Sequence, residues 1–172
     1  SRGLGDVYKR QRVHVADRPV RADWPLYLHR RYTRDEILIA VGYQSLSKQK
    51  SHREGVLWLK EEGVELLFVT LDKSDKAYSP TTRYEDYAVS PTRFHWQSQS
   101  TVREGSATGL RYRNSGARFL LFVRPQKGEA FTYLGPVRYS SHTGSRPMSI
   151  YWDLETAMPA AIFERFASLR AA

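Results

Sequence analysis

The most constraining feature of this 172-residue sequence is the run VELLFVTL, residues 64–71, which is apolar on both faces after Glu65. Such a run predicts a strand that is buried on both sides and therefore central in a sheet. A shorter apolar run at residues 56–59 precedes it. The two runs are separated by residues 60–63 (KEEG), which is hairpin spacing with a glycine available for a positive φ. We therefore predict a central strand paired with a shorter neighbour.

Further segments have strand-like patterns, and two have helical ones. The predicted strands are residues 84–89, 93–97, 119–123, 131–139 and 148–154. Thr33 and Glu36 have the spacing of a capping box, which predicts a short helix over residues 34–41 that ends at Gly42. Pro159 opens a second helix, AAIFERFASLR. Its apolar stripe consists of Ile162, Phe163, Phe166 and Leu169.

These elements together predict an α+β fold. The sheet is expected to be mostly antiparallel and curled or barrel-like, with two short helices flanking it. The polar, basic segment 45–53 is expected to be a loop, and so is the segment between Gly105 and Gly116.

The chain is long enough for one domain with its own core, which we place at residues 32–172. Residues 12–31 are rich in Arg, Asp and Pro and read as a connector, whose apolar island at residues 24–28 could dock on the domain. Residues 6–11 read DVYKRQ, which is what the transposon end used to prepare sequencing libraries encodes. Residues 1–11 are therefore hypothesised to be translated adapter sequence.

Composition and charge narrow the classes of partner. The absence of cysteine excludes disulfides, thiol nucleophiles and cysteine-based zinc sites. A net charge of +9, or +7 without the three basic and one acidic side chains of residues 1–11, favours polyanionic partners, although many basic proteins bind no nucleic acid. No run approaches the roughly 18 apolar residues of a membrane span, and no signal peptide is evident. We expect a soluble, cytoplasmic protein with no membrane partner.

The motifs of the common catalytic classes are missing. The sequence has no Walker loop, HExxH, HxK pair or GxSxG elbow, and its five histidines show no metal-ligand spacing. Glu85 and Asp86 are adjacent carboxylates, but neighbours on a strand point to opposite faces and cannot share a metal without a bend. We expect a non-catalytic chain with no metal and no cofactor. Since nuclease carboxylates can be far apart in sequence, a cryptic nuclease remains an alternative.

Residues 78–100, YSPTTRYEDYAVSPTRFHWQSQS, mix aromatics, hydroxyls, amides and carboxylates in a region of weak regular structure. A flipped base is held by aromatic stacking and by hydrogen bonds along its Watson–Crick edge, which needs such a mixture. The candidate base-pocket residues are Tyr78, Ser79, Tyr84, Glu85, Asp86, Tyr87, His95, Trp96, Gln97, Ser98 and Gln99. Asp86 is the preferred acceptor, because on an extended strand it would share a face with Tyr84. Aromatics such as Trp96 and Tyr84 are more often core residues, however, and a histidine such as His95 is more often structural.

Seven basic side chains are candidates for contacts with DNA phosphates. They are Lys48, Lys50, Arg53, Arg111, Arg113, Arg118 and Arg146. Exposed basic residues are often merely solvated, so both interpretations stay open for each of them.

At residues 66–100 the sequence resembles a known family. The segments LLFVTLDKSDKAYSPTTRYEDYAVSPTRFHWQSQS, TGLRYRN, FLLFVRPQ and FTYLGPVRYSSHTGSRPMSIYWDL resemble the domain of unknown function that ends many bacterial DEAD/DEAH-type helicases, often carrying a phospholipase-D nuclease. The resemblance covers about residues 32–154. It implies type IV, modification-dependent restriction, with a C-terminal domain whose fold is similar to the SET- and RING-associated (SRA) and PUA-like domains.

The resemblance implies that residues 32–172 form a DNA-recognition domain. It would read 5-methyl- or 5-hydroxymethylcytosine in double-stranded DNA by base flipping, and the helicase and nuclease domains of a parent ATP-dependent restriction endonuclease would be its partners. Alternatives are an interaction domain that couples helicase to nuclease without reading bases, and a reader of phosphorothioate DNA.

Overall fold

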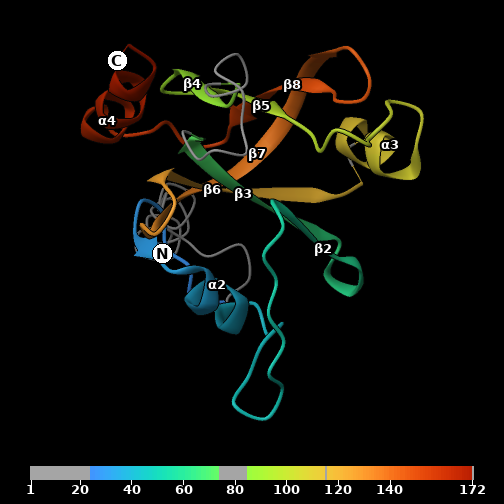
Figure 1. Ribbon diagram of the computed structural model, residues 1–172, viewed down its shortest axis with the longest axis vertical. Coiled ribbons are helices and arrows are strands. Elements are labelled where there is room, and N and C mark those ends of the chain that lie inside the picture. The colour runs from blue at the N-terminus through green and yellow to red at the C-terminus, as the bar shows by residue number, and fades with distance from the viewer. Residues whose placement is uncertain (1–23, 74–84, 115, 172) are drawn as a thin grey trace, which may run out of the picture.

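The computed structural model describes residues 24–73, 85–114 and 116–171, which form an α+β fold (Figure 1). The strands are β1 (Arg31–Tyr32), β2 (Val56–Leu59), β3 (Val64–Asp72), β4 (Tyr87–Ser90), β5 (Arg93–Gln97), β6 (Arg118–Gln126), β7 (Phe131–Thr143) and β8 (Ser149–Leu154). The helices are α2 (Arg34–Ala40), α3 (Ala107–Arg113) and α4 (Ala160–Ala171), with a 3₁₀ turn, η1 (Lys60–Glu62), after β2.

The eight strands form one sheet in the order β2-β3-β6-β7-β8-β5-β4, with β1 paired to β7. The pairing is antiparallel throughout except between β3 and β6, which run parallel. The predicted fold class is therefore confirmed. The β2–β3 hairpin is also as expected, with Gly63 in the left-handed region at φ 64°.

The apolar run that dominates the sequence becomes β3, which lies inside the sheet between β2 and β6. Its residues alternate between two cores, one on each face. Leu67, Val69 and Leu71 join a first core, and Val64, Leu66 and Phe68 join a second. The parallel neighbour β6 alternates in the same way. Both strands lack a solvated face, which explains the missing polar alternation.

The second core includes the apolar island of residues 24–28. Trp24, Leu26 and Leu28 are buried there against α2 and the sheet. Leu28 lies so close to Gly135 of β7 that a Cβ at this glycine would overlap its side chain, and Gly135 also has a φ of 90°. The island thus packs as part of the core. Residues 1–23, including the hypothesised adapter and most of the connector, lie outside the described residues.

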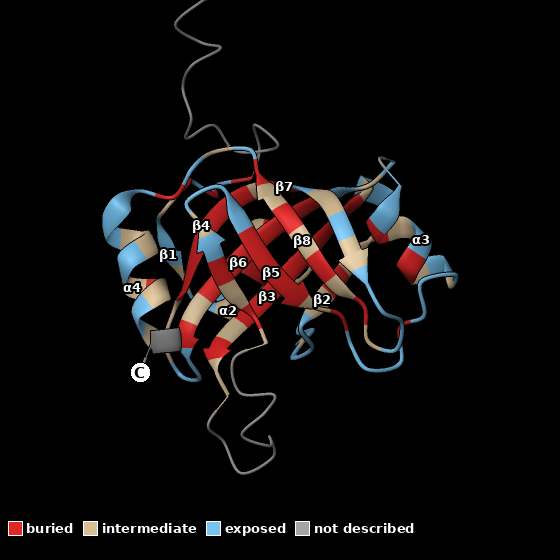
Figure 2. Cartoon of the chain, turned by 90° about the horizontal axis from the view of Figure 1, so that it is seen from above, coloured by how far each residue is buried: buried red, intermediate tan, exposed pale blue. Residues whose placement is uncertain are grey.

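The helices cover different parts of the sheet (Figure 2). α2 begins with the predicted capping box and lies on the second core, and α3 and α4 lie at opposite ends of the sheet. α4 packs Phe166 and its half-buried neighbours on the first core, as its apolar stripe predicted. Within the described part of the chain, no helix is long and apolar enough to span a membrane.

Two local expectations were wrong. The predicted loop between Gly105 and Gly116 contains α3, whose N-cap Ser106 accepts a hydrogen bond from the Gly109 amide. A Cβ at position 109 would collide with the carbonyl of Arg103, which explains why this position in the helix is a glycine. The strand predicted from residue 84 starts only at Tyr87, since residues 85 and 86 form a bend.

Candidate nucleic-acid pocket

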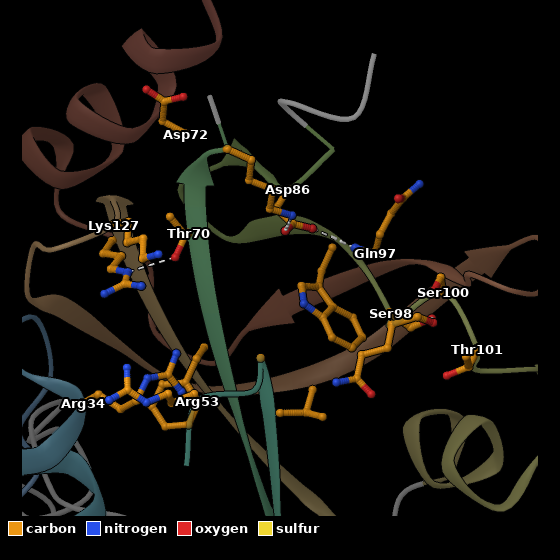
Figure 3. A pocket seen from close by; sticks show the side chains of 17 residues that line it. Arg34, Arg53, Thr70, Asp72, Asp86, Gln97, Ser98, Ser100, Thr101 and Lys127 are labelled. Carbon is orange, nitrogen blue, oxygen red and sulfur yellow. Dashed lines mark hydrogen bonds and ion pairs between the residues drawn. The ribbon is translucent and has the colours of Figure 1, made fainter. Parts of the chain in front are cut away.

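A cavity of about 710 Å³ opens between the two ends of the curled sheet. One wall comes from β3, β6 and the start of β2, and the other comes from β5 and the segment that follows it (Figure 3). Its lining residues are Arg34, Arg53, Gly55, Val56, Phe68, Thr70, Asp72, Lys73, Asp86, Trp96, Gln97, Ser98, Gln99, Ser100, Thr101, Arg124 and Lys127. Five of the predicted base-pocket residues are among them.

Asp86 is the buried carboxylate of this cavity, with 5% of its surface exposed. The backbone amide of Gln97 donates to its Oδ1 at 2.8 Å, and Lys73 Nζ lies 2.6 Å from its Oδ2. An ionised carboxylate has about four acceptor positions, so about two remain for a ligand. The bend at residues 85–86, rather than the strand face assumed from the sequence, places Asp86 in the cavity.

Trp96 lines the cavity and also belongs to the first core, where it makes ring contacts with Tyr112 and Trp152 at centroid distances of 5.3 and 6.1 Å. Only 4% of its surface is exposed. Trp96 is therefore a core aromatic that also lines the cavity, and its stacking on a base stays a prediction. Phe68, on the opposite wall, is the second aromatic among the described lining residues.

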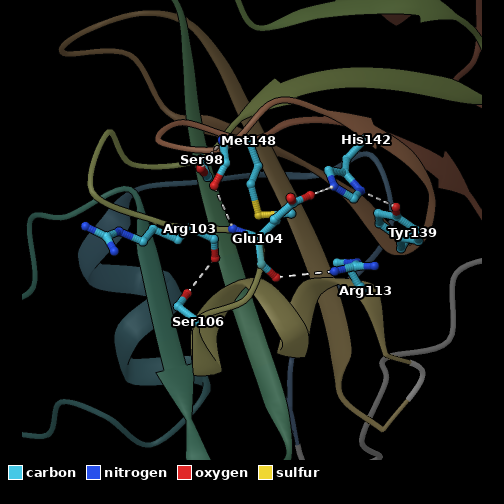
Figure 4. A network of polar contacts seen from close by, with 9 residues as sticks. Ser98, Arg103, Glu104, Ser106, Arg113, Tyr139, His142 and Met148 are labelled. Carbon is cyan, nitrogen blue, oxygen red and sulfur yellow. Dashed lines mark hydrogen bonds and ion pairs between the residues drawn. The ribbon is translucent and has the colours of Figure 1, made fainter.

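The side chains of Gln97 and Ser98 are hydrogen-bonded to β8 and to the residue that precedes it. Gln97 Nε2 donates to the hydroxyl of Ser149 at 3.2 Å, while Ser98 Oγ accepts from the Met148 amide at 2.9 Å (Figure 4). Ser98 is buried, and its role is to hold the chain after β5 against the β7–β8 turn. Gln99, by contrast, is exposed at the rim.

A polar network anchors the continuation of this rim (Figure 4). Glu104 Oε2 is hydrogen-bonded to His142 Nε2 at 2.8 Å, and His142 Nδ1 is hydrogen-bonded to Tyr139 Oη. The contact with His142 lowers the pKa of Glu104. Arg113 Nη1 donates to the Glu104 carbonyl. The network ties α3 and the rim to β7.

Three more of the predicted pocket residues, Glu85, Tyr87 and His95, do not line the cavity. His95 stacks on Tyr87 with ring centroids 4.7 Å apart and donates from Nδ1 to the Glu85 carbonyl, so these three form a cluster elsewhere on the sheet. His95 is thus a satisfied structural histidine. Tyr78, Ser79 and Tyr84 lie outside the described residues.

Sequence reasoning missed the basic half of the cavity. Arg34, Arg124 and Lys127 line it, and only Arg53 had been singled out. Arg124 carried a usable signal, because it is a charged residue directly after the buried run FLLFV. Arg34 carried no such sequence signal, since the first residue of a helix is commonly polar.

Arg111, predicted to contact phosphate, is committed to the protein instead. Its Nε and Nη2 donate to the two carboxylate oxygens of Glu65 at 2.9 and 3.1 Å, and its guanidinium lies 4.4 Å from the Trp58 ring centroid. Glu65 is fully buried, and the pairing raises the pKa of Arg111. The sequence could not show this pairing, because Glu65 stands at the start of the apolar run.

The other predicted phosphate contacts are spread over the surface. Lys48 and Lys50 are exposed in the loop that leads to the cavity rim, and Arg146 is exposed in the β7–β8 turn. Arg113 and Arg118 line a second cavity of about 480 Å³ beside α3. Among residues 24–73, 85–114 and 116–171, no cluster of three His, Asp or Glu side chains is placed to hold a metal ion.

Comparison with known proteins identifies a sequence family and a solved structure of similar fold. The profile of the family described as "Domain of unknown function (DUF3427)" matches residues 26–166. No curated protein matches the chain. Among solved structures, a chain of the crystal structure of an SUVH5 SRA–fully methylated CG DNA complex is similar, with a TM-score of 0.50 and 12% sequence identity. The similarity covers 77% of this chain and 90% of that chain, and it shows an SRA-like fold.

Proposed function

This chain belongs to the family described as Domain of unknown function (DUF3427), and from that premise we propose that it is a DNA-reading module for modified cytosine. In this proposal a cytosine carrying a 5-methyl or 5-hydroxymethyl group leaves the duplex and enters the 710 Å³ cavity. The SRA-like fold and the methylated-DNA complex in which the similar chain was solved support it.

The single observation that carries the proposal is Asp86. A buried carboxylate is costly unless it is paired, and this one is paired with Lys73 and with the Gln97 amide in the cavity wall. An ionised carboxylate only accepts hydrogen bonds, which matches the donor N4 amine of cytosine and opposes the O4 acceptor of thymine. Asp86 therefore selects cytosine in this proposal, and Trp96 forms the adjoining apolar wall.

The test is a titration of one duplex in four forms: unmodified, 5-methylated, 5-hydroxymethylated and phosphorothioated. We expect the modified-cytosine duplexes to bind more tightly than the unmodified one. The preference should be limited to about 10- to 200-fold, because a methyl group adds little apolar surface. An Asp86→Asn variant keeps an oxygen for the Gln97 amide but replaces the other acceptor with a donor. It should lose most of the preference and keep background DNA binding. Fluorescence of 2-aminopurine beside the target cytosine should rise if the base leaves the stack.

The matched control is Asp153→Ala, which removes an exposed carboxylate paired to Arg93 on β8. If Asp86→Asn folds normally by circular dichroism yet discriminates as the wild type does, the assignment of Asp86 is wrong. Equal binding of all four duplexes would favour a coupling domain that reads no bases. A preference for the phosphorothioated duplex alone would indicate a reader of phosphorothioate DNA.

We also propose that this chain serves as the target-recognition part of a larger helicase and nuclease protein of type IV restriction. Its own residues would then supply binding, and other domains would supply ATP turnover and cleavage. Sequencing the genomic locus upstream of residue 12 tests this context: reading frames for a helicase and a nuclease should be continuous with it.

A further inference from the structure

Three arginines from distant parts of the chain meet on one side of the cavity. Arg34 comes from the first turn of α2, Arg53 from the loop before β2, and Arg124 from β6. Figure 3 shows Arg34, Arg53 and Lys127 across the cavity from Gln97 and Ser98. The cavity therefore has a cationic side facing the side that holds Asp86 and Trp96.

Arg34 and Arg124 are held rigidly by neutral groups. The guanidinium of Arg34 lies 4.4 Å from the Phe68 ring centroid and donates from Nη1 to the Glu54 carbonyl at 2.8 Å. Arg124 Nε donates to Thr70 Oγ1 at 2.9 Å, and its guanidinium lies 4.4 Å from the Phe131 centroid. Among the described residues, no carboxylate forms a salt bridge with Arg34, Arg53 or Arg124.

Gathering like charges is unfavourable, and the attraction of Asp35 only partly offsets the repulsion at Arg34. Burial, then repulsion by Arg124 and Arg53, lowers the pKa of Arg34 to about 10. Burial also lowers the pKa of Arg124. Each guanidinium carries five N–H donors, and the described residues engage only one of those of Arg34. An anion between the arginines would use the remaining donors and relieve the repulsion.

Resting on the proposed function, we propose that the cavity takes a whole nucleotide, with Arg34, Arg53 and Arg124 binding its phosphate group. The base lies on the side of Asp86 and Trp96, and the phosphate lies on the side of the arginines. A volume of about 710 Å³ is in the range of pockets that hold complete small ligands rather than one ring. Planar guanidinium groups fit phosphate oxygens in pairs, which an ammonium group does not.

The direct test uses free ligands and the full chain. Isothermal titration would compare 5-methyl-2′-deoxycytidine 5′-monophosphate, the same nucleoside without phosphate, and inorganic phosphate. Because hydrogen bonds between charged groups are strong, the monophosphate should bind about 10-fold or more tightly than the nucleoside. In the double variant Arg34→Gln and Arg124→Gln, the monophosphate should fall to the nucleoside's affinity, and the nucleoside's own affinity should not change.

Two further variants distinguish a loss of phosphate binding from a folding defect. They are Arg53→Gln and Arg34→Lys. Arg53 is exposed, so its replacement should lower monophosphate affinity without lowering the melting temperature. Arg34→Lys keeps the charge but loses the paired donors, so it should retain only part of the gain. Arg103→Gln is the matched control, because it removes an exposed positive charge outside the cavity lining and should leave every affinity unchanged.

The outcomes separate this inference from the proposed function. Equal affinities for monophosphate and nucleoside would overturn the phosphate site and leave the reading of cytosine by Asp86 intact. A monophosphate preference that is the same for cytosine and thymine nucleotides would support the phosphate site and count against Asp86 as the selector. Tight binding of inorganic phosphate alone, with no added affinity from the nucleoside, would overturn the whole-nucleotide pocket.

Discussion

Single residues of the same type have opposite roles in this protein, as its arginines show. Arg111 is neutralised by the fully buried Glu65, whereas Arg34 and Arg124 face a cavity without a carboxylate partner among the described residues. Removing the first should therefore cost stability, and removing the others should cost binding. The distinction depends on the partner and not on the residue type.

Arg111→Ala should lower the free energy of unfolding by about 3 kcal/mol, because it leaves the buried carboxylate of Glu65 unpaired. Arg111→Glu should be worse still, since it brings a second carboxylate beside the first. Urea denaturation measures both. Arg113→Ala is the control on the same helix: its side chain is exposed and makes one long hydrogen bond, to the Glu104 carbonyl, so the change in stability should be about 1 kcal/mol or less. An Arg111→Ala variant as stable as the wild type would contradict the structural role.

At the scale of elements, α2 connects local sequence signals to the cavity. The Glu36 carboxylate accepts a hydrogen bond from the Thr33 amide at 2.8 Å, and Thr33 Oγ1 accepts from the Glu36 amide at 3.2 Å. Arg34 is the first residue inside this box. The capping box thus fixes the backbone from which Arg34 reaches the cavity.

The capping box should make the stability of α2 depend on pH. The hydrogen bonds from Thr33 lower the pKa of Glu36 in the folded state below its ordinary value of 4.5. A lowered carboxyl pKa stabilises the fold above the unfolded-state pKa, and this contribution disappears as the pH falls through the folded-state value. Glu36→Ala should therefore be less stable than the wild type at pH 7, with a difference that shrinks toward pH 3. Urea midpoints of both proteins at these two pH values measure it, and an equal difference at both would contradict the box.

For the whole molecule, the net charge of +9 should govern the strength of DNA binding more than its selectivity. Lys48 and Lys50 lie exposed on the loop that precedes Arg53, so we expect them to contact the backbone of a duplex bound as proposed. Phosphate contacts position a protein without reading sequence.

The double variant Lys48→Gln and Lys50→Gln should weaken binding of methylated and unmodified duplexes by the same factor. The plot of log affinity against log salt concentration should become shallower by about 2, because each lost phosphate contact removes roughly one unit of slope. Fluorescence anisotropy at several salt concentrations gives both quantities. A wild-type affinity that does not change with salt would rule out an interface dominated by phosphates.

The sequence by itself determined most of the elements, because their signals are local. The two-faced apolar run predicted β3, the Thr33–Glu36 spacing predicted α2, and the apolar stripe after Pro159 predicted α4. Two elements were missed: β1, which lies in the expected connector, and α3, which lies in the expected loop between Gly105 and Gly116. Gly109 in α3 is required by a close approach of the preceding turn, because the carbonyl of Arg103 leaves no room for a Cβ there.

Only the tertiary structure decided which side chains share the cavity. Asp86 and Trp96 were expected together from one segment, but Glu85, Tyr87 and His95 of the same segment form a separate cluster. Arg34 and Arg124, far apart in the chain, join the cavity instead. A sequence shows each charge but not its partner, and pairing and burial decide whether an arginine stabilises the fold or is available to bind a phosphate.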